Sequence, residues 1–92
     1  MRQLKIQGNS MSPTIEDGEI VLYVPRVEVK VGDIVLMPHP FKKSVKIVKR
    51  LSEIHPGGRL TLVGDNPAES TDSRTFGTIS INSVQGRIEC KW

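Results

Sequence analysis

The stretch "SVKIVKRL", residues 44–51, alternates as a β-strand does and carries one unexpected charge. Successive side chains of an extended chain point to opposite faces, so every second residue shares a face. One face is almost wholly apolar and holds Val45, Ile47, Lys49 and Leu51. The other face, predicted to be the polar one, holds Ser44, Lys46, Val48 and Arg50. Lys49 is therefore the single charge on the apolar face of this strand.

The rest of the chain repeats this pattern of short, β-branched apolar runs between turn-forming residues. The strongest turn signals contain glycine, proline or aspartate and lie at residues 16–18, 31–33, 38–40 and 55–58. Helical periodicity is not sustained anywhere. The predicted strands lie within residues 4–6, 20–24, 34–37, 45–51, 60–63 and 84–90. The sequence therefore predicts an all-β chain.

Length and composition predict one compact domain with a modest core. The chain has 92 residues, of which 37% are hydrophobic. Its single cysteine, Cys90, excludes an internal disulfide and a CxxC site, which fits a reducing compartment. Residues 1–6 contain no apolar run long enough for a signal peptide or a membrane span, so we expect a soluble chain.

The charge pattern gives little support for a nucleic-acid partner. The formal charge is +3, but 13 basic residues are interspersed with 10 acidic ones and cluster only within residues 42–50. Aromatic residues make up 4% of the chain, which leaves few rings for stacking on bases. We therefore expect no nucleic-acid partner, although a small β-barrel binding module that uses the basic cluster is an open alternative.

A second stretch, "GNSMSPTIEDGE" at residues 8–19, holds Ser10 in a stiff setting and raises the question of what would activate it. A serine hydroxyl is a poor nucleophile until a neighbouring base removes its proton. His39 lies between two prolines and His55 opens a Pro-Gly-Gly turn, and such positions favour solvated loop histidines. Lysine is the other choice of base, and Lys49 is the candidate.

A catalytic lysine must first lose its proton. An ordinary lysine has a pKa of about 10.4 and is neutral roughly once in 2,500 molecules at pH 7. Lowering the pKa by about 3 units, which costs about 4 kcal/mol, is within reach of burial among aliphatic side chains. On alternation alone, however, a lysine that snorkels from a strand edge is the favoured interpretation of Lys49.

One long polar segment departs from the strand pattern. It is "GDNPAESTDSRTFG", residues 64–77, and it follows the apolar run at 60–63. A loop of this length in so small a domain is more often functional or disordered than neutral.

Four stretches together resemble the sequence boxes of type I signal peptidases, which belong to the S24/S26 superfamily of serine proteases. "GNSMSPTI" at 8–15 resembles the nucleophile box, "VGDIVLM" at 31–37 the Gly-Asp strand box, "IVKRL" at 47–51 the lysine box, and residues 64–77 the last box. The resemblance implies a mostly β fold, a small, partly open β-barrel like the catalytic core of signal peptidase I and the self-cleaving repressors. It also implies a single Ser-Lys peptidase catalytic domain over residues 1–92, with no metal or organic cofactor.

Carried over by position, the resemblance implies roles for individual residues. Ser10 resembles the nucleophile and Lys49 the general base. The implied supporting residues are Ser70, which orients the lysine, Asp72 and Arg74, which form a structural ion pair, and Asp65, which shapes the loop.

Met11 is expected to pack against the substrate groove, with a core methionine as the equal alternative. The resemblance implies that the backbone N–H of Ser10 holds the oxyanion. Some relatives have a serine as a second donor where this chain has Gly8, so backbone or solvent would supply that donor here.

A narrower resemblance concerns the substrate. "HPFKKS" at 39–44, the variant last box and the expected lack of a membrane anchor resemble the small branch of nickel-type superoxide dismutase maturation proteases. This branch implies a Ser-Lys endopeptidase that removes an N-terminal leader from that precursor, in the cytoplasm or at a membrane through a partner. Two alternatives stay open: a general signal peptidase-like domain lacking its membrane anchor, and a non-catalytic β-barrel binding module. A self-cleaving domain is disfavoured, because only nine residues precede Ser10.

Overall fold

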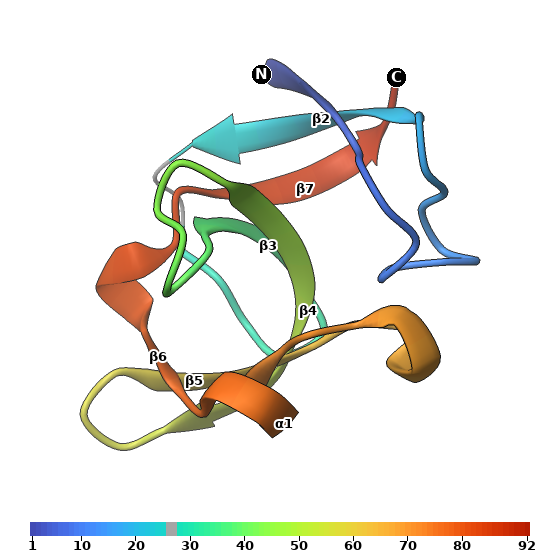
Figure 1. Cartoon of the computed structure of the whole chain (residues 1–92). Helices are drawn as coiled ribbons and strands as arrows, with labels where there is room; N and C mark the ends of the chain where they lie inside the picture. The colour runs from blue at the N-terminus through green and yellow to red at the C-terminus, as the bar shows by residue number, and fades with distance from the viewer. Residues whose placement is uncertain (26–27) are drawn as a thin grey trace.

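The computed structural model describes residues 1–25 and 28–92 and shows one seven-stranded antiparallel sheet (Figure 1). The strands are β1 (Arg2–Lys5), β2 (Ile20–Pro25), β3 (Ile34–Pro38), β4 (Lys46–His55), β5 (Arg59–Val63), β6 (Ile79–Ser80) and β7 (Gly86–Lys91). Their order across the sheet is β1-β2-β7-β3-β4-β5-β6. The C-terminal strand β7 thus lies between β2 and β3 and joins the two halves of the chain.

The prediction of a mostly β fold is confirmed. Each of the six predicted runs overlaps an observed strand, although β1 begins two residues before the predicted run. The two-residue strand β6 was not predicted, because it is too short to show alternation. The sheet curls but does not close into a barrel, since β1 and β6 are its two edges (Figure 1).

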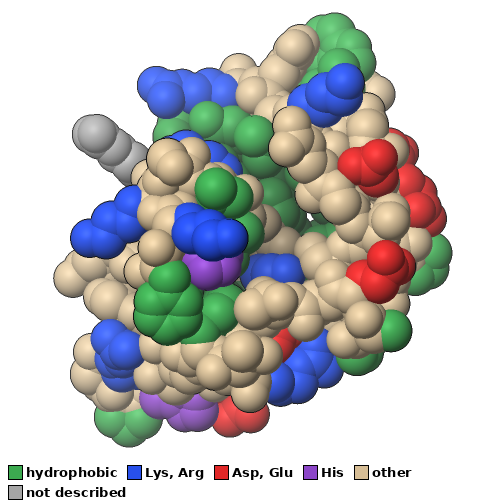
Figure 2. Space-filling model, viewed as in Figure 1, with side chains coloured by type: hydrophobic (Ala, Val, Ile, Leu, Met, Phe, Trp, Pro, Cys, Tyr) green, Lys and Arg blue, Asp and Glu red, His purple; other side chains and the backbone are tan. Residues whose placement is uncertain are grey.

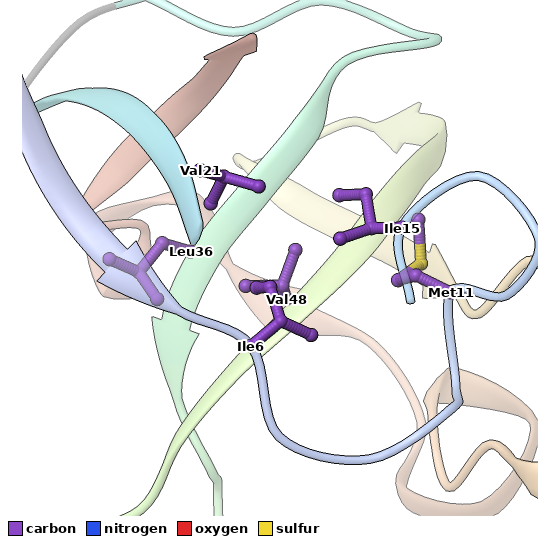
Figure 3. Packing of buried hydrophobic residues seen from close by; sticks show 6 residues of the cluster. All are labelled: Ile6, Met11, Ile15, Val21, Leu36 and Val48. Carbon is purple, nitrogen blue, oxygen red and sulfur yellow. The ribbon is translucent and has the colours of Figure 1, made fainter. Parts of the chain in front are cut away.

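Two clusters of apolar side chains form the core, and they lie on opposite faces of β3 and β4. The first cluster, drawn in Figure 3, consists of Ile6, Met11, Ile15, Val21, Leu36 and Val48. The second consists of Val35, Met37, Leu51, Leu60, Leu62 and Ile79. Neighbouring residues of β3 therefore point into different clusters, as strand alternation requires.

The predicted polar face of residues 44–51 is wrong for Val48. This side chain is only 8% exposed and packs in the first core cluster. Residues of β1 and of the turn after it cover this face of β4, which the alternation pattern of β4 alone does not reveal (Figure 3). On the predicted apolar face, Leu51 is fully buried and Lys49 is only 3% exposed, so Lys49 does not snorkel from a strand edge. The prediction is wrong for Val45, which is 45% exposed and precedes β4.

The polar segment at residues 64–77 is folded rather than a featureless loop. It contains a 3-10 turn, η1 (Pro67–Glu69), and a one-turn helix, α1 (Ser73–Phe76); a second 3-10 turn, η2 (Ile81–Ser83), follows it. Asp72 caps α1 by accepting a hydrogen bond from the backbone N–H of Arg74 at 3.0 Å. A single helical turn is too short for the periodicity that predicts helices, which explains why it was missed.

Candidate active site

Ser10 lies in a turn between β1 and β2 that the core holds in place. The Ser12 N–H donates to the Asn9 carbonyl at 3.1 Å, and the Ile15 N–H donates to the Met11 carbonyl at 3.0 Å. Met11 and Ile15 are buried in the first core cluster, while Ser10 is half-buried. Burial of these two apolar side chains fixes the turn and leaves Ser10 at the surface of the core.

A second set of hydrogen bonds ties this turn to the segment at residues 64–77. The Asn66 N–H donates to the Ser10 carbonyl at 2.8 Å, and the Asn66 side-chain amide donates to the Asn9 carbonyl at 3.0 Å. The Thr14 hydroxyl donates to Asp65 Oδ2 at 2.6 Å. These bonds join residues more than 50 positions apart and fix where Ser10 lies. Asn66 and Thr14 were not singled out from the sequence.

Gly64 allows the two segments to approach closely. A Cβ atom at this position would lie 2.2 Å from Ser70 Oγ and 2.6 Å from the Ser10 carbonyl oxygen. Both distances are shorter than any real contact of a Cβ atom, so only glycine fits. The Gly-Asp-Asn start of the last box could have indicated this requirement, but the sequence does not show what the glycine would contact.

Lys49 is buried and has a hydroxyl, not a carboxylate, as its hydrogen-bond partner. Its Nζ donates to Ser70 Oγ at 3.0 Å, and Ser70 Oγ donates to Asp72 Oδ2 at 2.8 Å. Burial lowers the pKa of Lys49, the negative charge of Asp72 partly opposes this shift, and the charge of Arg74 adds to it. The net effect makes the neutral amine easier to form than in an exposed lysine.

Asp72 is fully buried and its carboxylate is surrounded by donors. It accepts hydrogen bonds from the Gly64 N–H at 2.8 Å, from Ser70 Oγ, and from Arg74 Nε at 3.0 Å. Burial by itself would raise the pKa of Asp72, but the hydrogen bonds from Arg74, Gly64 and Ser70 outweigh it and hold this pKa far below its usual range. Asp72 therefore stays ionised, and it also pairs with Arg74 as the resemblance implies.

Arg50 forms a second ion pair that sequence reasoning missed. Its Nε and Nη2 atoms donate to the two carboxylate oxygens of Asp65 at 2.8 and 2.7 Å, and its Nη1 donates to the Gly32 carbonyl at 2.8 Å. The hydrogen bond from Arg50 lowers the pKa of Asp65. The bidentate contact and the bond to Gly32 together join three of the four sequence boxes. No local sequence signal links Arg50 to a residue 15 positions away.

Ser10 and Lys49 line the same groove, a cavity of about 350 Å³ on the face shown in Figure 2. One wall comes from the end of β1 and the turn after it, and the other comes from the start of β4. The lining residues are Leu4, Lys5, Ile6, Gln7, Ser10, Met11, Ser44, Val45, Lys46, Ile47, Val48 and Lys49. Within the described part of the chain, the Ser10 hydroxyl makes no hydrogen bond to Lys49. Met11 both belongs to the core and lines the groove, so its two predicted placements are compatible.

Neither histidine lies in this groove. His39 Nδ1 accepts a hydrogen bond from the Phe41 N–H at 3.1 Å, and its ring lies 6.0 Å from the ring of Phe76. His55 Nε2 lies 2.7 Å from Thr61 Oγ1, at the far end of β4.

Across residues 1–25 and 28–92, His, Cys, Asp and Glu side chains form no group of three or more that could hold a metal ion. The described helices are all too short to cross a membrane.

The sequence is also similar to those of known proteases. Residues 2–88 match the Peptidase S24-like family. The chain is 32% identical to subunit 1 of the mitochondrial inner membrane protease of Homo sapiens and of Mus musculus, over 88% of this chain and 63% of each relative. The Xenopus tropicalis subunit is 33% identical over 62% of this chain and 46% of that protein. The chain thus spans less than two thirds of the length of these relatives. Because the family match covers almost all of its residues, this chain belongs to the S24-like peptidases.

Proposed function

We propose that this peptidase is a serine endopeptidase in which Ser10 is the nucleophile and Lys49 is the general base. The observation that carries the proposal is the environment of Lys49, which is buried, hydrogen-bonded only to the Ser70 hydroxyl among the described residues, and open to the groove that Ser10 also lines. A general base must be able to shed its own proton near neutral pH, and burial favours this. Residues 1–92 would then act as one catalytic domain.

The chemistry follows the usual steps of acyl transfer. Neutral Lys49 Nζ removes the proton from Ser10 Oγ as the oxygen attacks the peptide carbonyl, and the resulting ammonium protonates the leaving amine. A water molecule then attacks the acyl-enzyme while Lys49 accepts its proton, and Lys49 returns that proton to Ser10 Oγ as the bond between Oγ and the acyl carbon breaks. Catalytic hydrogen bonds are often absent or long in a free enzyme and form only when substrate binds. The lack of a hydrogen bond between the Ser10 hydroxyl and Lys49 Nζ therefore fits this scheme.

Ser70 and Asp72 are assigned positioning roles. The Ser70 hydroxyl uses its proton to donate to Asp72. The lone pairs of Ser70 Oγ are then free to accept from Lys49, and this hydrogen bond fixes where Nζ lies. For the oxyanion, the backbone N–H of Ser10 is the proposed donor. Gly8 has no hydroxyl to offer, and its own N–H already donates to Asp17 Oδ1 at 2.7 Å.

The groove is suited to an extended peptide because strand edges form both of its walls. In β4, the Leu51 N–H donates to the carbonyl of Asp33, directly before β3. Because backbone groups alternate between the two sides of a strand, those of Lys46 and Val48 point away from β3. Pairing with β5 begins only at residue 50, which leaves this edge open. Directly after β1, the Ile6 N–H donates to the Glu19 carbonyl beside β2, so alternation turns the backbone groups of Lys5 outward. A substrate strand can therefore pair with these edges beside Ser10.

For the substrate, we propose a precursor whose N-terminal leader is removed, with nickel-type superoxide dismutase as the specific candidate. The sequence resemblance at residues 39–44 and 64–77 supports this choice. In that dismutase the new N-terminal amine and the following His-Cys residues bind nickel, so metal loading must wait for the cut. We place this cleavage in the cytoplasm or at a membrane reached through a partner. The mammalian relatives are named as inner membrane proteases.

The test is to incubate the purified protein with the dismutase precursor and to map the new N-terminus by mass spectrometry. We expect cleavage immediately before the His-Cys sequence and no cleavage by Ser10→Ala. Ser12→Ala is the matched control, because the Ser12 hydroxyl donates to Glu16 and does not line the groove. An intact precursor beside efficient cutting of ordinary secretory leaders would instead assign the domain to the general signal peptidases.

A further inference from the structure

The groove carries uncompensated positive charge on both of its walls. Lys5 ends β1 on one wall, Lys46 begins β4 on the other, and both side chains are exposed. Neither aspartate nor glutamate is among the residues that line the groove. The rim is therefore cationic, whatever the protonation state of Lys49.

The ion pairs of the described residues lie outside this groove. The ion pairs between carboxylates and Lys or Arg in the described residues are Arg50–Asp65, Arg74–Asp72, Arg87–Glu89 and Lys91–Glu19. None of them includes Lys5 or Lys46. Lys46 Nζ donates to the side-chain oxygen of Gln85 at 2.5 Å, and this amide is neutral. A neutral partner orients the ammonium without cancelling its charge.

We propose that this groove selects substrates with acidic side chains in the segment that lies between β1 and β4, and that Lys5 and Lys46 determine this preference. The inference rests on the proposed function and adds a substrate class to it. A strand paired with these edges places its side chains beside both lysines, because neighbouring strands are about 4.8 Å apart. Charges that line a cleft with apolar walls also focus their field into it and attract the opposite charge.

The experiment compares peptides that differ by one residue. A cleaved peptide is prepared with glutamate, glutamine or lysine at each position on both sides of the cut, and kcat/KM is measured at low and high salt. At one or more positions, we expect kcat/KM for the glutamate peptide to exceed that for the glutamine peptide by about two- to fivefold, which is the range for exposed charge pairs. The kcat/KM of the lysine peptide should fall below that of the glutamine peptide. The difference should shrink at high salt. Equal rates for the three peptides at every position would overturn the proposal.

Charge-reversed variants test the two lysines. Lys5→Glu and Lys46→Glu should each invert the preference at the substrate position that the lysine faces. Lys30→Glu is the matched control, since it changes the net charge equally from an exposed position that does not line the groove. Inversion by Lys30→Glu as well would show a general charge effect and would contradict the assignment.

A binding measurement separates this inference from the proposed function. Fluorescence anisotropy with Ser10→Ala reports peptide affinity without cleavage, and the glutamate peptide should bind more tightly than the glutamine peptide. Cleavage of the glutamine peptide by the wild type, with no charge preference in either assay, would overturn only the inference. A charge preference in binding, with no cleavage of any peptide by the wild type, would support the inference and contradict the proposed protease.

Discussion

Lys49 and Arg50 are neighbours in β4, yet the pKa values of their side chains shift in opposite directions. Arg50 meets Asp65 directly through two hydrogen bonds, and this contact raises the pKa of its guanidinium. Lys49 reaches Asp72 only through the Ser70 hydroxyl, and burial lowers the pKa of its ammonium. Alternation sends the two side chains to opposite faces of one strand, and both meet the segment at residues 64–77.

The segment at residues 64–77 thus supplies two kinds of contact: a carboxylate that pairs with Arg50 and a hydroxyl that holds Lys49. A bidentate arginine–carboxylate pair fixes geometry because its charges are permanent. A lysine held by a hydroxyl is oriented without gaining a full counter-charge, so it can still lose a proton. Four predictions, from the largest expected effect to the smallest, test this comparison.

Replacing Lys49 with arginine should abolish activity. Arginine keeps the positive charge but cannot lose its proton, so we expect kcat/KM to fall by about a thousandfold or more. Peptide cleavage at neutral pH measures the effect, and Lys30→Arg is the control for the same exchange at an exposed site. Retention of substantial activity by Lys49→Arg would rule out a neutral-lysine base.

Gly64→Ala should displace the two contacts that meet at this glycine. The added Cβ clashes with Ser70 Oγ and with the Ser10 carbonyl, so we expect a loss on the order of a hundredfold in kcat/KM. Gly18→Ala is the matched control, because Gly18 has a positive φ but open space around it. That change should reduce the free energy of unfolding by about 1 kcal/mol and leave cleavage largely intact. The reverse ranking of the two activities would show that the contact at Gly64 does not position the site.

Asp72→Asn should change both the rate and its pH dependence. We expect a loss of about tenfold in kcat/KM, because the Ser70 hydroxyl loses the carboxylate that orients it. The charge of Asp72 raises the pKa of Lys49, so its removal should move the rising limb of the pH–rate profile to lower pH. Asp65→Asn, which removes the carboxylate facing Arg50, should leave that limb in place. A shift of equal size in both variants would erase the distinction between the two aspartates.

The Arg50–Asp65 pair should contribute modestly to stability and only when Asp65 is ionised. The folded pKa of Asp65 is lowered, so its contribution is present above the ordinary carboxyl pKa of about 3.9 and is lost as the pH falls through the folded value. At pH 7 we expect Asp65→Asn to reduce the free energy of unfolding by about 1 kcal/mol. Denaturant unfolding at pH 7 and in strong acid measures this, and a difference that persists unchanged in acid would contradict it.

Local patterns predicted part of this arrangement. Alternation in residues 44–51 placed Lys49 among apolar side chains, and the turn residues separated the strands correctly. The burial of Val48 and the fit of Gly64 could not be predicted, because each depends on a segment distant in the chain that packs against it. The bonds from residue 65 to Thr14 and Arg50 have the same origin. Only the resemblance to known peptidases linked such distant residues from the sequence.

The most direct test is the titration of Lys49 itself by NMR, using the side-chain Cε and Nζ signals and assigning them by their loss in Lys49→Arg. Burial lowers the pKa of Lys49, so it should titrate below the ordinary lysine value of about 10.4. The same ionisation should appear as the rising limb of kcat/KM with pH, since only the neutral amine can accept the proton from Ser10. A Lys49 that titrates at or above the ordinary value, or a kinetic limb at a different pH, would contradict the assignment of Lys49 as the base.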